Sequence, residues 1–315
     1  MKIISFILLN LIFFTLSNAQ EGSEIFKVLA SKGNNRLVAA GSSEEKPLTI
    51  GKKLYKGDKL VLLEGSYLGL VHKSGKTIEL KKSGTFEVAK LSNEVASQNA
   101  SVSKKYVDFV MGEMTAKDED ISKNRHKYMD VTGSVERDIH GEKIHLIAPP
   151  KEVGALVLSS PIVIRWEPLK DVQKYSVFVT NMFGDTLHKA ETSTSFVDLD
   201  LSTLNPHNEN IPQIISVEVK DNRKIKSEGY VLKYIPAPKA IELKKDIDNL
   251  KSEFIENTPL NKIMLAKFYE QNKLYLSAME CYQQAIELAP DVDDFQAEYG
   301  HFLIRNRIKP EPVSK

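Results

Sequence analysis

"LSAMECYQQAIELAP", residues Leu276 to Pro290, is the most regularly patterned stretch of the chain. Its signature positions recur at spacings of 4, 3 and 5 residues, at Ala278, Tyr282, Ala285 and Pro290. Side chains three or four positions apart share one face of a helix. The spacing therefore predicts a helix that packs through its small and aromatic residues and ends before the proline.

The only cysteine of the chain, Cys281, lies inside this stretch. A reactive thiol favours an exposed, positively charged setting at the start of a helix. Cys281 instead lies in the middle of the predicted helix, beside Glu280. We therefore expect a buried thiol that packs as a small apolar side chain rather than a nucleophile. One cysteine also excludes an internal disulfide and a cysteine-rich zinc site.

Helical spacing continues on the N-terminal side of this stretch. The "NTP" tripeptide at 257–259 is a stop and start signal, which predicts one helix ending near residue 256 and another beginning at Pro259. The earlier helix is marked by apolar residues at Ile241, Ile247, Leu250 and Phe254.

From Pro259 the sequence resembles one tetratricopeptide repeat, a helix pair of 34 residues. Leu265 and Ala266 match the small-residue contact of the first helix, and the opening stretch matches the second helix. Residues 293–306 resemble the first helix of a following repeat. The resemblance implies a short stack of helical hairpins over residues 239–308.

Repeats of this family stack into a concave surface that binds extended peptides or helices. The first helix of each pair lines that surface, so the resemblance implicates Ile263, Lys267, Glu270 and His301 as a possible partner groove. A second interpretation is that the repeat only caps the neighbouring β unit.

The N-terminal part of the chain is patterned as short strands and turns. In "LYKGDKLVLLEGSYLGLVHKSGKTIELKKSGTFEV", which begins at Leu54, the turn Ser74-Gly75 separates two alternating runs. The expected strand residues are Leu68, Leu70, His72, Ile78 and Leu80, with Phe86 and Val88 continuing the alternation.

Four short motifs in this region, at Leu54, Gly57-Asp58, Ser66 and Gly75, resemble the FecR-like β domain. The resemblance covers residues 25–92. Known FecR-like proteins relay an envelope signal to a sigma factor through an inner-membrane helix and a cytoplasmic segment. Neither segment is apparent in this sequence, so the β domain is expected without that signalling mechanism.

Residues 150–235 follow a Pro149-Pro150 boundary and show alternating strands at intervals expected for a two-sheet sandwich. The segment "IVIRWEP…KYSVFVTNMFGDTL" resembles a fibronectin type III-like domain with an immunoglobulin-like fold. Trp166 lies on an early strand and Tyr175 opens the next. Trp166, the only tryptophan, is expected in the core rather than at a ligand.

The first residues have the pattern of an export signal. Lys2 precedes an apolar run, and Ser17-Asn18-Ala19 supplies a small-x-small cleavage pattern, so residues 1–19 are predicted to be a signal peptide. No later segment is apolar enough to cross a membrane. A soluble, exported, periplasmic protein is expected. Residues 93–149 are predicted to be a connector with a short helix near 102–114.

The expected architecture is therefore multidomain, mainly β followed by α. The 315 residues carry a formal net charge of +1, which argues against general nucleic-acid binding. The catalytic and nucleotide-binding motifs that short patterns can identify are absent from the sequence. His140 and His145 lack further ligands at metal-binding spacing. No enzyme activity, cofactor or metal is predicted.

Three classes of function remain open. The first is a non-enzymatic cell-envelope scaffold or adaptor that binds envelope protein partners through the tetratricopeptide-like helices. The second is a cell-wall or polysaccharide-binding module, or an envelope sensor related to FecR. An enzyme of an unrecognised class is the third, and it has the least support from sequence motifs.

Overall fold

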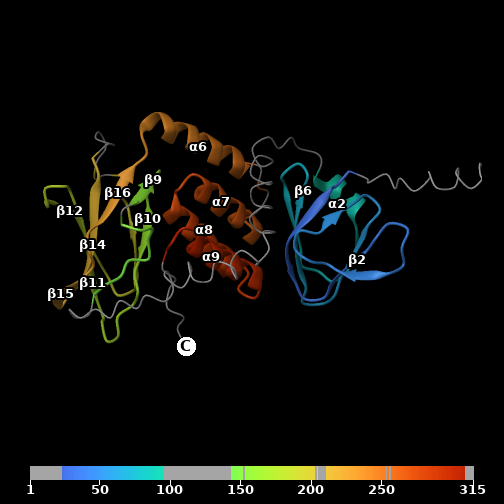
Figure 1. Ribbon diagram of the computed structural model, residues 1–315, viewed down its shortest axis with the longest axis horizontal. Coiled ribbons are helices and arrows are strands. Elements are labelled where there is room, and N and C mark those ends of the chain that lie inside the picture. Colours follow the sequence, from blue (N-terminus) through green and yellow to red (C-terminus); the bar gives the residue numbers. More distant parts are fainter. Residues whose placement is uncertain are drawn as a thin grey trace, which may run out of the picture.

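The computed structural model describes residues 23–95, 143–151, 153–202, 204, 211–252, 254 and 257–308. The first two thirds of the chain form β sheets, and the last third forms helices, as the sequence predicts. Figure 1 shows that the C-terminal helices lie between the two β units rather than at one end. The helices that follow both β units in the sequence thus lie between them in space.

The N-terminal β unit contains two four-stranded sheets, in the orders β4-β1-β6-β7 and β3-β2-β5-β8. Apolar side chains from both sheets meet in one core, so the sheets pack face to face. The elements are β1 (Phe26–Lys32), β2 (Asn35–Val38), β3 (Glu45–Pro47), β4 (Lys53–Leu54), β5 (Lys59–Leu62), β6 (Tyr67–His72), β7 (Thr77–Leu80), β8 (Gly84–Glu87) and α2 (Val88–Val95).

The expected turn between β6 and β7 is confirmed, with Gly75 at φ +97°. The expectation that Val88 extends the last strand is wrong. Val88 begins α2, because Val88, Leu91 and Val95 recur at helical spacing and bury one face of that helix against the core.

Strand β6 is buried along its whole length. Leu68 and Leu70 point into the core of the N-terminal unit. Tyr67 and Val71 belong to the core that the helices share. A strand buried on both faces must have layers on both sides, so β6 joins the N-terminal unit to the helical region.

The second β unit pairs a six-stranded sheet with a two-stranded one. The larger sheet runs β12-β11-β14-β16-β9 with β15 beside β14, and β10 pairs with β13. The strands are β9 (Ala155–Val157), β10 (Ile162–Arg165), β11 (Tyr175–Thr180), β12 (Thr186–Thr192), β13 (Phe196–Leu199), β14 (Gln213–Val219), β15 (Asn222–Lys226) and β16 (Tyr230–Tyr234).

The inward residues of both sheets share a core in this second unit. Trp166 is 1% exposed, and its ring meets Tyr175 edge-to-face at a centroid distance of 5.2 Å. The prediction that the single tryptophan is a core residue is confirmed. Strand β9 pairs in parallel with β16, the last strand before the helices.

The helical region comprises α6 (Ala237–Ser252), α7 (Pro259–Gln271), α8 (Tyr275–Leu288) and α9 (Asp293–Arg305). The predicted helix start is confirmed, because Thr258 caps α7 by accepting a hydrogen bond from the Asn261 N–H and Pro259 is the first helical residue. Ile241 does not lie on the buried face of α6, since 69% of it is exposed.

One continuous apolar core connects the helices to both β units. Polar contacts reinforce it on each side. The Ser31 N–H donates to Asp294 Oδ2 at 2.8 Å, and Lys32 forms an ion pair with Asp291. On the other side, Arg165 Nη2 lies 3.0 Å from Glu280 Oε2.

The predicted signal peptide at 1–19 and the predicted helix near 102–114 lie outside the described residues. None of the helices in the described ranges is both long and apolar enough to cross a membrane.

Candidate functional site

The four residues predicted to line a partner groove do not form an open surface. Ile263 and Lys267 are 0% exposed and Glu270 is 9% exposed. His301 is partly buried, with 30% of its side chain exposed. The groove prediction is therefore wrong for the three α7 residues, because the faces that α7 would offer to a partner are covered within this chain.

Three of the four predicted residues nevertheless come together, in a buried charge cluster. We use this name for Lys267, Glu270, Glu298 and Arg305, which lie on α7 and α9 with His301 at the edge. Lys267 is ion-paired with Glu298, and its Nζ lies 3.6 Å from Glu270 Oε2. Ile263 stays apart from the cluster, in the apolar core.

Arg305 holds the cluster together from α9. Its Nε and Nη2 atoms donate to Glu270 Oε1 and Oε2, each at 3.1 Å, and Nη2 also donates to Glu298 Oε1 at 3.0 Å. The hydroxyl of Tyr282 donates to Glu270 at 3.0 Å, and the Asn306 amide donates at 2.9 Å. Such a fork of charge-assisted bonds is geometrically specific.

The two carboxylates stay ionised despite their burial. Burial alone raises the pKa of Glu298, but nearby His301, whose Nδ1 lies 3.9 Å from Glu298 Oε2, and the charges of Lys267 and Arg305 outweigh it and bring the pKa to about 2. Burial likewise opposes ionisation of Glu270, yet its pKa is lowered by Lys267 and Arg305. The cluster thus pairs two cations with two anions. Each buried charge depends on the opposite charges beside it to remain ionised.

We expect Glu298→Gln to flatten the acid dependence of stability. A carboxyl with a lowered pKa in the folded state stabilises the fold above its unfolded pKa of about 4.3, and that contribution is lost as the pH falls through about 2. The variant should be about 3 kcal/mol less stable than the wild type at neutral pH, and the difference should shrink as the pH falls.

Thermal unfolding followed by circular dichroism across this pH range measures the effect. Glu287→Gln is the matched control, since Glu287 is an exposed residue of α8. A constant gap between wild type and Glu298→Gln at all pH values would show that Glu298 is not held ionised by the cluster.

Cys281 is a buried residue of α8, as predicted, with 8% of its surface exposed. Burial raises the pKa of its thiol to about 12. A thiol that stays protonated and covered is a poor nucleophile. The structure therefore places Cys281 among packing residues.

A thiol-labelling reagent should fail to modify the folded protein and should react once the chain is unfolded in urea. Cys281→Ala should cost about 1 kcal/mol of stability through the lost packing. This variant also serves as the blank, because the chain has no other cysteine. Rapid labelling under native conditions would contradict the packing role.

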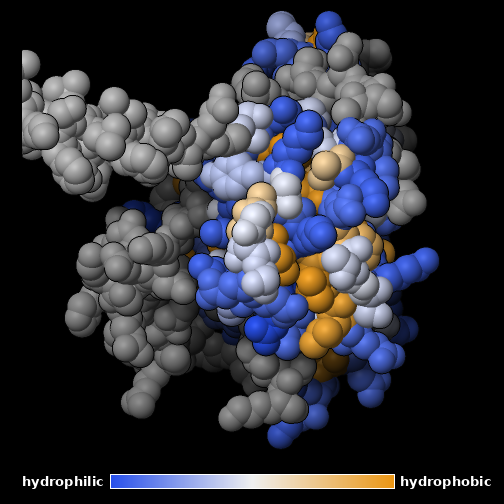
Figure 2. Space-filling model, turned by 90° about the vertical axis from the view of Figure 1, so that its right-hand side faces the viewer, coloured by the Kyte–Doolittle hydropathy of each residue, from blue (hydrophilic) through white to orange (hydrophobic). Residues whose placement is uncertain are grey.

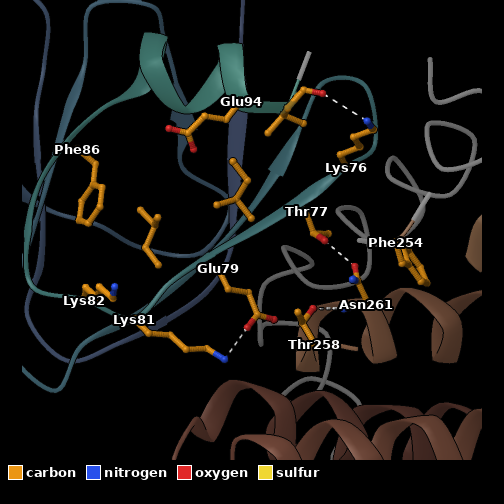
Figure 3. A pocket seen from close by; sticks show the side chains of 13 residues that line it. Lys76, Thr77, Glu79, Lys81, Lys82, Phe86, Glu94, Phe254, Thr258 and Asn261 are labelled. Atoms are coloured by element: carbon orange, nitrogen blue, oxygen red, sulfur yellow. Dashed lines mark hydrogen bonds and ion pairs between the residues drawn. The ribbon is translucent and has the colours of Figure 1, made fainter. Parts of the chain in front are cut away.

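An open cleft of about 510 Å³ lies along strand β7, which is within the range of ligand-binding pockets. Figure 3 shows α2 on one side of the cleft and Phe254, Thr258 and Asn261 on the other. Lys76 lies at one end of β7, and Lys81 and Lys82 follow its other end. The side walls carry Phe86, Glu94 and Val95 on one side and Phe254, Thr258 and Asn261 on the other.

Hydrogen bonds fix strand β7 against the α7 side of the cleft. Thr77 Oγ1 donates to Asn261 Oδ1 at 2.5 Å. Glu79 Oε1 accepts a hydrogen bond from the Leu260 N–H at 2.9 Å, which places a carboxylate at the positive N-terminal end of α7. Lys81 Nζ lies 3.1 Å from the other oxygen of Glu79.

Within the described ranges, no group of three or more His, Cys, Asp or Glu side chains could hold a metal ion. His145 lies in those ranges, but its predicted neighbour His140 does not.

Comparison with known proteins adds no assignment. No protein-family model matches the chain. No curated protein is significantly similar to it. The FecR-like, fibronectin type III-like and tetratricopeptide-like resemblances thus rest on the sequence motifs and remain predictions.

Sequence reasoning did not find the β7 cleft. Thr77, Glu79 and Asn261 are ordinary polar residues in sequence, and about 180 positions separate the strand from α7. A usable signal was present in the lysines that flank β7, because charges at strand ends are typical of exposed sheet edges.

Proposed function

We propose that this protein is a non-enzymatic, exported scaffold of the cell envelope that binds partner proteins on its β units. The observation that carries the proposal is the position of the helices. Their shared core includes side chains from both β units, so the helical region works as an internal spacer. This arrangement fits the interpretation in which the repeat packs within the chain rather than forming an open groove.

The surfaces that bind partner proteins then lie on the outer faces of the two β units. Figure 2 looks onto the N-terminal β unit from the side away from the helices and shows a strip of apolar surface among charged side chains. Leu63 is 49% exposed in this unit, and Phe183, at a turn of the second unit, is 90% exposed. A contiguous apolar patch rimmed by polar side chains, such as the strip in Figure 2, is typical of protein interaction sites.

Crosslinking of the full chain in its native envelope, followed by mass spectrometry, tests the proposal. Partner crosslinks should map to the two β units and the β7 cleft, with few to the buried faces of α7. Recovery of no partner protein would overturn the scaffold function. Turnover in a broad hydrolase screen, abolished by one acidic or histidine substitution, would replace it with an enzyme.

A further inference from the structure

Among the described strands, β7 is the last of its sheet, and no described strand pairs with its outer edge. The His72 N–H donates to the Lys76 carbonyl at 2.7 Å, which sets the hydrogen-bonded pairs of the β6–β7 ladder. Such pairs alternate along antiparallel strands. Thr77 and Glu79 therefore direct their main-chain N–H and C=O groups away from β6. In the described part of the chain, no main-chain hydrogen bond reaches those outward groups.

The outer edge of β7 faces the β7 cleft. One wall of the cleft belongs to the N-terminal β unit and the other to the helical region. Ile78 and Leu80 lie on one face of the strand, beside Phe86 and Val95 of the N-terminal unit. Phe254 lies across the cleft, at the start of the helical wall. A strand that entered here would find main-chain partners at the edge and apolar contacts for alternate side chains.

We propose that the β7 cleft binds an extended peptide segment of a partner protein, which adds a strand to β7 and sets an acidic side chain beside Lys81 and Lys82. This inference rests on the proposed scaffold function and names its docking site and the kind of segment it takes.

The charge of the β7 cleft favours an acidic peptide as its occupant. Lys81 and Lys82 are both exposed at the end of the strand. The carboxylate nearest to them, Glu79, is only 6% exposed at its side chain; one of its oxygens accepts a hydrogen bond from the start of α7 and the other pairs with Lys81. The lining of the cleft carries three lysines, Lys76, Lys81 and Lys82, against two carboxylates, Glu79 and Glu94, so its net charge is positive. Lysines at a sheet edge disfavour pairing with a second copy of the same edge, whereas an acidic strand gains from them.

Binding of a synthetic peptide to the full chain tests the proposal. The probe is a fluorescein-labelled peptide of about eight residues, long enough to follow β7, that alternates valine and threonine and carries a glutamate at each end. Two matched probes carry lysine at the ends or N-methyl groups on alternate amides. The glutamate peptide should bind at least about tenfold more tightly than either matched probe.

The protein variants provide the second half of the test. Lys81→Glu combined with Lys82→Glu should weaken binding of the glutamate peptide about tenfold. Lys56→Glu, at an exposed turn outside the cleft, should change it less than about twofold. Equal binding of the three peptides, or an unchanged affinity in the double variant, would overturn the proposal.

A photo-crosslinker placed at Lys82 identifies the occupant in the envelope. Capture of a partner protein through an extended segment with an acidic side chain at the crosslink supports the inference, and capture of a segment without one, of only a second copy, or of this chain's own residues overturns it. If envelope crosslinking still recovers partners with the double variant at unchanged yield, the scaffold function stands and the β7 docking site fails.

Discussion

Replacing Glu270 with alanine is expected to lower the free energy of unfolding by about 3–5 kcal/mol, the loss typical of breaking a buried ion pair. Glu270 accepts both arms of the Arg305 guanidinium and lies 3.6 Å from Lys267 Nζ. Lys267 is 0% exposed, so water cannot replace the missing charge. Two cations would then share the one remaining carboxylate, Glu298. Urea unfolding of the full chain, followed by circular dichroism, measures the loss.

Three variants separate charge from packing in that experiment. Glu287→Ala removes an exposed carboxylate from the neighbouring helix and should change stability by less than about 0.5 kcal/mol. Glu270→Gln keeps the size of the side chain but not its charge, and should recover only part of the loss. Replacing Lys267, Glu270, Glu298 and Arg305 together with apolar residues should cost less than Glu270→Ala alone. A loss below about 1 kcal/mol for Glu270→Ala would show that the cluster is solvated.

Local patterns predicted the elements of the helical region well. Thr258 and Pro259 carry a start signal that depends only on neighbouring residues, and the structure confirms it. Ala278, Tyr282 and Ala285 are buried, as their helical spacing predicts. These predictions succeeded because capping and helix periodicity are properties of a few consecutive residues.

The exposure of α7 could not be predicted in the same way. Whether a helix face is open depends on which distant segment covers it, and Ser31 bonds Asp294 across 263 positions. Helix periodicity carries no information about such a partner. Strand β6 did carry one clue, because "YLGLVH" from Tyr67 lacks the polar alternation of a strand with one wet face. That run predicts a layer on each side of the strand.

The charges on α7 were also ambiguous in sequence. Lys267 and Glu270 have the spacing of a solvated helix pair, and the tetratricopeptide resemblance assigned both to a partner groove. Burial with Glu298 and Arg305 turns the same residues into an internal connection between α7 and α9. The cluster thus favours one fixed packing of the helices, which a spacer between two β units requires.

Tyr67→Ala is expected to loosen the N-terminal β unit from the helices without unfolding either part. Tyr67 is 5% exposed and meets Phe295 of α9 edge-to-face at a centroid distance of 5.9 Å. Its ring belongs to the core shared with the helices and not to the core of its own unit. Removing it should therefore cost about 3 kcal/mol or more, chiefly at the interface.

Small-angle X-ray scattering and hydrogen exchange measure this change in the full chain. The radius of gyration should rise, and β1, β6 and α9 should exchange faster where they meet, while strands of the second β unit keep their protection. Phe183→Ala is the control, because its ring is 90% exposed at a distant turn. Unchanged scattering and exchange in Tyr67→Ala would mean that the ring does not hold the units together. A larger radius of gyration together with faster hydrogen exchange in Tyr67→Ala would show that the three units act as one body only while this contact is intact. A scaffold built around an internal helical spacer requires such a contact.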